Sequence, residues 1–229
     1  MFNYLEDKIR KLILDYGWEE YYRRKPWELH VHDLIQCPRR SFFELYFGAN
    51  PIPKDHMIFG RILHNTLLRE VIPKALKTKY IEKEVKHEVK LKDQIITIKG
   101  RIDAIIEYNN ELILLELKTT QAGYIVREHM RAIAYTQACT YTYIWNQHYT
   151  PEIKKIWLLI TQYPLRIDDK WRIEIYEYSY DPEVAQKAIE RGITIINHLI
   201  NNTIPKDNCP LFEFECKDCP FNIICKYIK

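Results

Sequence analysis

The sequence lacks any apolar run long enough to cross a membrane, since a spanning helix needs about 20 consecutive apolar residues. Its first residues, M-F-N-Y-L-E-D-K-I-R-K, carry charges where a signal peptide needs an apolar stretch. These absences exclude a membrane protein and predict a cytoplasmic one. Glycine is scarce too, with 6 residues against 17 tyrosines, and together with abundant Ile, Lys and Glu this composition points to a thermophilic source.

A strong charge of one sign is also missing. The formal net charge is only +3, whereas nucleic-acid-binding proteins usually present a strongly basic face. Any phosphate contacts must therefore come from local clusters, and each cluster is explained equally well as a solvated surface. The candidates are Arg23, Arg24 and Lys25, then Arg39 and Arg40, then Arg127 and Arg131.

No internal repeat and no low-complexity linker divides the chain. Its 229 residues suffice to bury a core without disulfide staples, and we expect one domain over residues 1–229. Apolar residues at helical spacing predict helices over 2–16, 33–46 and 59–72, with Asp33 as a cap and Cys37 in the first turn of the second helix. A long helix is predicted over 124–145 and another over 182–201.

Period-two alternation marks the strands. It predicts three consecutive strands over 80–92, 95–107 and 111–118, joined as antiparallel hairpins, and two later strands over 153–161 and 171–178. Helix, three strands, helix, strands and helix in this order predict an α/β fold, in which a mixed sheet is flanked by helices.

Two carboxylates and a lysine are predicted to lie close together on two neighbouring strands of this sheet. Glu116 and Lys118 share one face of their strand, and Asp103 lies on the preceding strand across a short turn. Two carboxylates side by side repel unless a cation lies between them, and hard oxygen ligands suit Mg²⁺ or Mn²⁺. Such an ion supplies what phosphodiester hydrolysis requires, and Lys118 is positioned to orient the water and stabilise charge on the phosphate.

Three further side chains fit the same site. His64, in Gly60-x-x-x-His64, offers another metal ligand, and Gln137 and Tyr141 share one face of the long helix. Each signal is weak alone, because an E-x-K pair is usually a solvated edge pair and a lone helical histidine is usually structural. Their order and placement together favour a nuclease.

Cysteines cluster at the end of the chain. Cys216, Cys219 and Cys225 form C-x-x-C-x-x-x-x-x-C, and Cys37 and Cys209 compete as the fourth ligand of a zinc or iron–sulfur site. Thiols in a cytoplasmic protein are ligands more often than disulfides. Cys139, amid the predicted long helix, is interpreted as ordinary packing.

The motifs Gly60-x-x-x-His64, Gly100-Arg101-Ile102-Asp103, Glu116-Leu117-Lys118 and Gln137-x-x-x-Tyr141 resemble, in order, those of RecB-type nucleases of the PD-(D/E)XK superfamily. With Cys37 and the C-terminal cysteines added, the chain is similar to the CRISPR-associated protein 4 family over roughly residues 37–225.

The resemblance implies a restriction-endonuclease-like core over about 78–180, with a cluster-bearing helical region from 30–75 and 205–229. It implies that His64, Asp103 and Glu116 bind Mn²⁺ or Mg²⁺, and that Lys118 is catalytic with Gln137 and Tyr141 beside it. It also implies that Cys37, Cys216, Cys219 and Cys225 hold a [4Fe–4S] cluster, which we expect to be structural.

Members of this family degrade single-stranded DNA, commonly from the 5′ end, and help process DNA captured as CRISPR spacers. The resemblance therefore implies a DNA exonuclease, with CRISPR integrase proteins as partners. A DNA-end binding adaptor of a CRISPR integration complex is the alternative from another class, although the intact nuclease motif argues against it. A related viral or recombination nuclease carries the same motifs and stays open.

Overall fold

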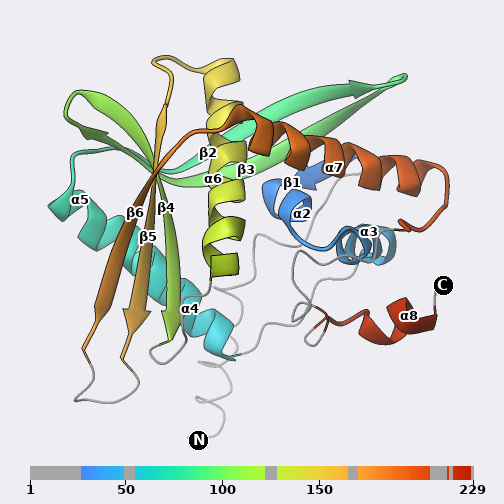
Figure 1. Cartoon of the computed structure of the whole chain (residues 1–229), viewed down its shortest axis with the longest axis horizontal. Coiled ribbons are helices and arrows are strands. Elements are labelled where there is room, and N and C mark those ends of the chain that lie inside the picture. Colours follow the sequence, from blue (N-terminus) through green and yellow to red (C-terminus); the bar gives the residue numbers. More distant parts are fainter. Residues whose placement is uncertain are drawn as a thin grey trace, which may run out of the picture.

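A computed structural model describes residues 27–48, 55–121, 128–164, 170–206, 216 and 219–227. Within these ranges a six-stranded mixed sheet has helices packed on both faces (Figure 1). The fold is α/β, as the sequence predicted. The predicted helix at 2–16, the basic cluster at 23–25, and Cys209 lie outside the described residues.

The prediction of a single helix over 33–46 is wrong, because two helices cover this segment. α2 covers Val31–Ile35 and α3 covers Pro38–Phe47, with Cys37 as the residue that caps α3 and not within its first turn. Pro38 explains the break, since proline lacks an N–H and disfavours helical geometry in the residue before it. The predicted cap is wrong as well: His30 is the N-cap of α2, and Asp33 lies in its first turn, where its carboxylate accepts the His30 N–H at 2.7 Å.

The helix predicted over 59–72 is longer and irregular. α4 covers Asp55–Thr66, a π-helical turn η1 covers Leu67–Val71, and α5 covers Ile72–Ala75. Pro73 lies in the first turn of α5. Such π turns often mark functional sites, and this one directly follows His64.

Three antiparallel strands form one part of the sheet, as predicted: β2 Thr78–Leu91, β3 Gln94–Tyr108 and β4 Glu111–Gln121. Helix α6, Glu128–His148, then leads to β5 Lys155–Tyr163, which pairs in parallel with β4, and β6 Arg172–Ser179 pairs antiparallel with β5. Helix α7 covers Pro182–Ile200. The sequence analysis missed the short strand β1, Glu28–His30, which runs parallel to β3.

One edge of β3 is left open at its centre. β1 pairs with Thr97–Lys99 and β4 pairs with Ala104–Tyr108, so no described strand occupies that edge between Gly100 and Asp103. On the opposite edge β2 keeps an unbroken register with β3 across this point, with Ile81 opposite Ala104 and Lys83 opposite Ile102. Side chains from the helices can therefore reach β3 here.

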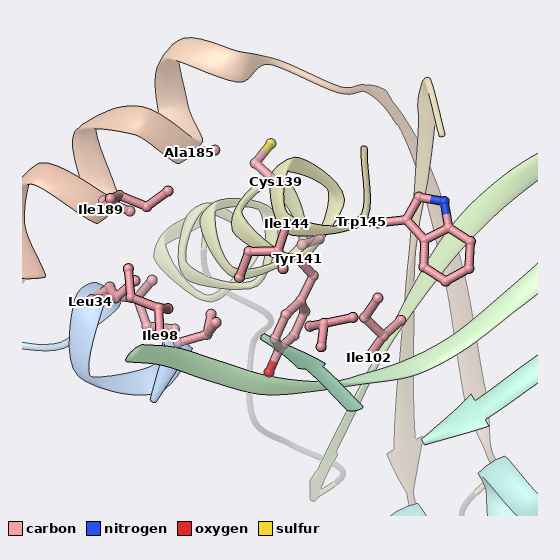
Figure 2. Packing of buried hydrophobic residues seen from close by; sticks show 14 of the residues in the cluster. Leu34, Ile98, Ile102, Cys139, Tyr141, Ile144, Trp145, Ala185 and Ile189 are labelled. Atoms are coloured by element: carbon pink, nitrogen blue, oxygen red, sulfur yellow. The ribbon is translucent and has the colours of Figure 1, made fainter. Parts of the chain in front are cut away.

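Helix α6 fills that opening from one side of the sheet. Side chains of α6 pack between the sheet and helices α2 and α7, and Figure 2 shows Tyr141 directed toward β3 while Cys139 lies toward Ala185 of α7. Cys139 is fully buried in this core, which confirms its packing role. On the other face, Leu68 and Ile72 cover the alternate residues of β4.

The C-terminal helix α8, Asn222–Tyr227, lies beside α3 (Figure 1). Phe42 and Phe43 of α3, Ile195 of α7 and Phe221 form a small separate core, with Cys219 and Cys225 packed against it. Among the helices described, none has the length and apolar character that crossing a membrane requires.

Candidate active site

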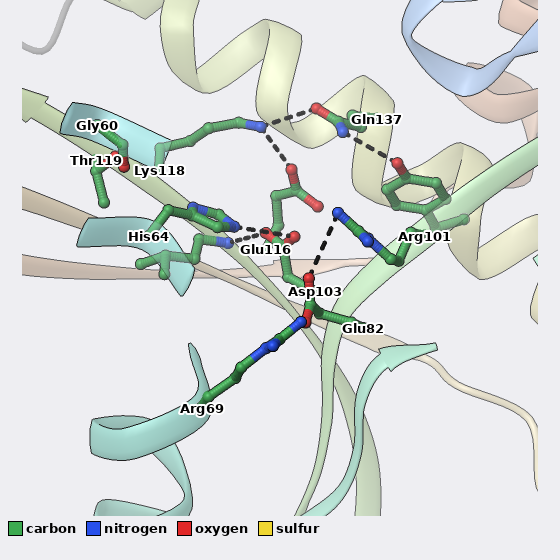
Figure 3. Close-up of polar contacts among 12 residues, drawn as sticks. Gly60, His64, Arg69, Glu82, Arg101, Asp103, Glu116, Lys118, Thr119 and Gln137 are labelled. Carbon is green, nitrogen blue, oxygen red and sulfur yellow. Dashed lines mark hydrogen bonds and ion pairs between the residues drawn. The ribbon is translucent and has the colours of Figure 1, made fainter. Parts of the chain in front are cut away.

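Glu116 and Lys118 project together from β4, as their spacing predicted. The Lys118 ammonium donates to Glu116 Oε1 at 2.6 Å and to Gln137 Oε1 of α6 at 2.9 Å (Figure 3). Glu116 is almost completely buried, with 1% of its surface exposed. A carboxylate at that depth needs compensating charge or bonds, because burial without them is costly.

Asp103 lies beside Glu116 and is fixed from two sides. Its Oδ2 accepts the backbone N–H of Leu117 at 2.8 Å, and its Oδ1 is 3.3 Å from Nε2 of His64 on α4. The bond to Leu117 uses a backbone donor at the point where β3 and β4 are no longer paired. The β3–β4 hairpin therefore brings Asp103 to Glu116, as the sequence predicted, and α4 brings His64 to Asp103.

Gln137 and Tyr141 form the α6 side of the site. The Gln137 amide donates to the Tyr141 hydroxyl at 3.2 Å, while its carbonyl holds Lys118. The Tyr141 ring lies against Gly100, where an added Cβ would come within 2.3 Å of ring atom Cε1. Glycine at position 100 is thus required by the close approach of the tyrosine.

Burial sets the electrostatics of these groups. It raises the pKa of Glu116 to about 7, with a further contribution from the neighbouring Asp103, whereas Lys118 and His64 act in the opposite direction. Burial disfavours the charged form of Lys118, but the two carboxylates outweigh that effect and raise its pKa. Lys118 therefore stays charged, while Glu116 gains a proton easily when no further cation is present.

Glu116 Oε2 is buried and has no hydrogen-bond partner. An orphaned carboxylate oxygen next to a second carboxylate fits a hard divalent cation, which would supply both the missing partner and the missing charge. The described residues contain no ready-made group of three or more histidine, cysteine, aspartate or glutamate side chains that could hold a metal. The predicted ligand set His64, Asp103 and Glu116 therefore stays a prediction.

The sequence analysis missed a charged bridge beside Asp103. Glu82, within β2, adopts a positive φ of 49°, a conformation that is rare for residues other than glycine. Its carboxylate accepts the Arg69 Nε–H at 2.6 Å and lies 3.4 Å from an Arg101 nitrogen (Figure 3). In the sequence, only the position of Arg101 within Gly100-Arg101-Ile102-Asp103 hinted at this bridge.

The cysteines gather at the junction of α3 and α8. Burial raises the pKa of both Cys219 and Cys225, and Cys37 adds to the effect on each of them. Cys216 also raises the pKa of Cys219. The backbone N–H of Cys219 donates to the carbonyl of Cys216 at 3.4 Å. Residues distant in sequence are thus brought together, and none of the cysteines that the structure describes forms a disulfide.

One basic cluster is not a surface for phosphates. Arg39 is buried, with 4% of its surface exposed, and its Nε–H donates to the Pro205 carbonyl at 2.8 Å. Arg40 pairs with Glu44 one turn along α3 at 2.9 Å. Arg39 therefore ties α3 to the chain after α7, while Arg127 lies outside the described residues.

Comparison with known proteins supports a nuclease. The sequence model of the PD-(D/E)XK nuclease superfamily matches residues 68–226. The CRISPR-associated exonuclease Cas4 of Saccharolobus solfataricus is 30% identical over 203 residues, which cover 86% of each chain.

Solved structures agree with the fold. The crystal structure of SSO0001 superimposes with a TM-score of 0.68 at 24% identity and covers 95% of this chain and 96% of its own. The crystal structure of a putative exonuclease from Eubacterium rectale superimposes with a TM-score of 0.53 at 11% identity, and the match covers 93% of this chain and 92% of that one. The chain belongs to the PD-(D/E)XK nuclease superfamily and, within it, to the family of the CRISPR-associated exonuclease Cas4.

Proposed function

We propose that this nuclease is a Mg²⁺- or Mn²⁺-dependent exonuclease that degrades single-stranded DNA from the 5′ end and processes DNA for CRISPR spacer acquisition, together with integrase proteins. The observation that carries the metal-dependent chemistry is the buried, unpartnered Oε2 of Glu116 beside Asp103. Membership of the Cas4 family supports the proposed substrate and context.

Glu116, Asp103 and His64 are the residues we assign to the cation. When bound, the ion polarises a phosphoryl oxygen and lowers the pKa of a coordinated water. The Leu117 N–H meanwhile holds Asp103 Oδ2 at 2.8 Å, and His64 Nε2, 3.3 Å from Asp103 Oδ1 in the metal-free protein, would give its lone pair to the ion. A carboxylate fixed in this way keeps its orientation when substrate arrives.

Lys118 is the residue we assign to the developing charge. Its raised pKa keeps the ammonium protonated, and the Glu116 and Gln137 oxygens fix its direction. A positioned cation of this kind stabilises the phosphorane-like transition state and orients the attacking water. Gln137 in turn is held by the Tyr141 hydroxyl, which burial keeps protonated by raising its pKa.

The test is cleavage of a 5′- or 3′-labelled single strand with Mn²⁺ by the Lys118→Ala protein. Cleavage should fall at least about 100-fold, the usual cost of losing a transition-state contact. Lys155→Ala is the matched control, because Lys155 also pairs with a strand glutamate, Glu111, at 2.5 Å but on the surface. Undiminished cutting by Lys118→Ala would refute the role assigned to Lys118, whereas a wild-type protein that binds the strand without cutting it would support the adaptor function.

We also propose that Cys37, Cys216, Cys219 and Cys225 hold a [4Fe–4S] cluster with a structural role. The mutual influence of Cys37, Cys219 and Cys225 and their position on the aromatic core of Phe42, Phe43 and Phe221 support this assignment. A ligand at each end of the chain would close a very long loop and restrict the unfolded state.

The protein should be brown when purified, and should contain iron and acid-labile sulfide. Cys219→Ser should lose the colour, whereas Cys139→Ala should keep it, because Cys139 is buried against α7 in the main core. Stoichiometric zinc in a colourless wild-type protein would replace the cluster with a zinc site. A brown Cys37→Ser protein with full iron content would assign the fourth ligand to Cys209.

A further inference from the structure

An aromatic pair borders the candidate active site on the α4 side. Phe59 of α4 and Tyr163, the last residue of β5, have ring centroids 5.2 Å apart in an edge-to-face arrangement. Phe59 nevertheless exposes 52% of its surface, and Ile62, one turn further along α4, exposes 40%. A large aromatic ring is thus braced by a second ring while much of its surface stays open to solvent.

The backbone places this pair close to the catalytic residues. The Thr119 hydroxyl donates to the Gly60 carbonyl at 3.3 Å, so the residue after Phe59 lies against the residue after Lys118. Tyr163 is paired with Gln121 in the parallel β4–β5 register, three positions beyond Lys118 and Ile160. His64, five residues after Phe59 on the same helix, contacts Asp103.

Helix and strand geometry give the distances between this aromatic pair and the catalytic residues along the chain axes. Five helical residues separate Phe59 from His64 by about 7.5 Å along the helix axis. Three strand residues separate Tyr163 from the Lys118 level by about 10 Å. Stacked bases of one DNA strand are about 3.4 Å apart, so along these axes the pair lies about two to three nucleotides from the level of a phosphate held at the carboxylates.

Open aromatic rings beside a phosphate-cleaving site suit one ligand chemistry in particular. Nucleobases stack on aromatic side chains regardless of sequence, because every base has a π-face. Single exposed apolar residues are common and need no ligand. Phe59 differs because its ring is held by Tyr163 and because the Gly60–Thr119 bond fixes its height at the end of β4, on the α4 face of the sheet, from which His64 reaches Asp103.

We propose that Phe59, braced by Tyr163, stacks against a base of the DNA strand within about three nucleotides of the scissile phosphate. The inference rests on the proposed DNA substrate. It gives the chain a sequence-independent grip on an unpaired base, which a base inside a duplex cannot offer without flipping out of the stack. The pair therefore favours single-stranded over fully paired DNA.

The experiment measures binding of a fluorescent single-stranded oligonucleotide in a Lys118→Ala background, so that cleavage does not interfere. Phe59→Ala should weaken binding roughly 10-fold, which corresponds to one lost base stack, and Phe59→Trp should restore it. Tyr108→Ala is the matched control, because Tyr108 exposes 48% of its surface and its ring contacts Trp157 at 5.0 Å, at the other end of the β3–β4 hairpin.

A set of oligonucleotides with one abasic position each then identifies the stack. When Phe59 is intact, removing the base at one position near the scissile phosphate should weaken binding of the oligonucleotide. In the Phe59→Ala variant, removing the same base should not weaken binding further. Equal losses at every position, or equal binding by both proteins, would overturn the inference.

Two other outcomes are separable. If the Phe59 protein in this background binds no single-stranded DNA at all, the proposed substrate fails together with the stack. If Phe59→Ala changes the mass measured by light scattering and the abasic pattern is absent, this face contacts a second copy of the chain and the inference is wrong.

Discussion

The carboxylate site and the cysteine region are built in different ways. In the carboxylate site each side chain comes from a regular element and is fixed by a short bond, as with Lys118 between Glu116 and Gln137. In the cysteine region the thiols come from a helix cap, Cys37, and from the end of the chain, and they rest on a small aromatic core. The first arrangement holds repelling charges in place for chemistry, whereas the second joins distant segments.

This difference predicts opposite responses to substitution. A change in the carboxylate site should remove activity and leave stability unaffected or improved. A change in the cysteine region should remove stability, with activity lost only as a consequence. The following variants are ordered from the largest expected effect to the smallest.

Asp103→Asn should have the largest effect. The Leu117 N–H donates to Asp103 Oδ2 at 2.8 Å, and the amide oxygen of asparagine can still accept this bond. The negative charge that would attract the cation is lost. Cleavage should fall by about 100-fold or more. Because repulsion of Glu116 is relieved, the melting temperature of the metal-free protein should stay equal or rise. A large drop in that temperature would mean that Asp103 is mainly structural.

Cys219→Ser should show the reverse pattern. If Cys219 holds the proposed cluster, losing it should cost about 3 kcal/mol, which lowers the melting temperature of a chain of this size by roughly 6–12 °C. Cleavage per folded molecule should fall much less than in Asp103→Asn. Circular dichroism on heating, compared with Cys139→Ala, measures the first quantity, and an unchanged melting temperature would contradict the structural role.

Gly100→Ala should damage the carboxylate site through packing alone. The new Cβ would lie 2.3 Å from the Tyr141 ring, so the ring and Gln137 must move, at a cost of about 1–3 kcal/mol. Gly60→Ala is the control, because its Cβ would meet only Thr119 Oγ1 at 3.8 Å. Chemical denaturation should separate the two variants, and equal stability would show that α6 adapts freely.

The smallest effect concerns pH. Because the pKa of Glu116 is about 7 in the folded protein against an ordinary 4.5, the folded state holds its proton more tightly than the unfolded chain. Stability of the metal-free protein should therefore fall as pH rises from about 4.5 to about 7, by at most about 1.4 kcal/mol per pH unit. Glu116→Gln should flatten that slope, measured by denaturation in chelator, and an identical slope would contradict the raised pKa.

Much of the carboxylate site could be predicted from the sequence because strand geometry determines it. Period two placed Glu116 and Lys118 on one face, and a short turn brought Asp103 beside them. The strained Glu82 and its bonds to Arg69 and Arg101 could not be predicted, since they depend on how η1 packs against the sheet. The contact of Tyr141 with Gly100 likewise needs the position of α6.

The cysteine region was less accessible to prediction. The clustering of Cys216, Cys219 and Cys225 was visible, but nothing in their spacing reveals which distant thiol joins them. The structure brings Cys37 near them because Pro38 starts a new helix and Arg39 anchors it to the Pro205 carbonyl at 2.8 Å. These are contacts between segments more than 160 residues apart, which local patterns do not encode.

Calorimetric titration of Mn²⁺ into the metal-free protein and into Glu116→Gln tests the central claim most directly, because it addresses the unpartnered Oε2 of Glu116. The wild-type protein should bind Mn²⁺ with release of part of a proton near pH 7, since Glu116 is then half protonated. Glu116→Gln should bind much more weakly and release no proton. Equal affinity and equal proton release in the two proteins would contradict the assignment of the cation to this pair of carboxylates.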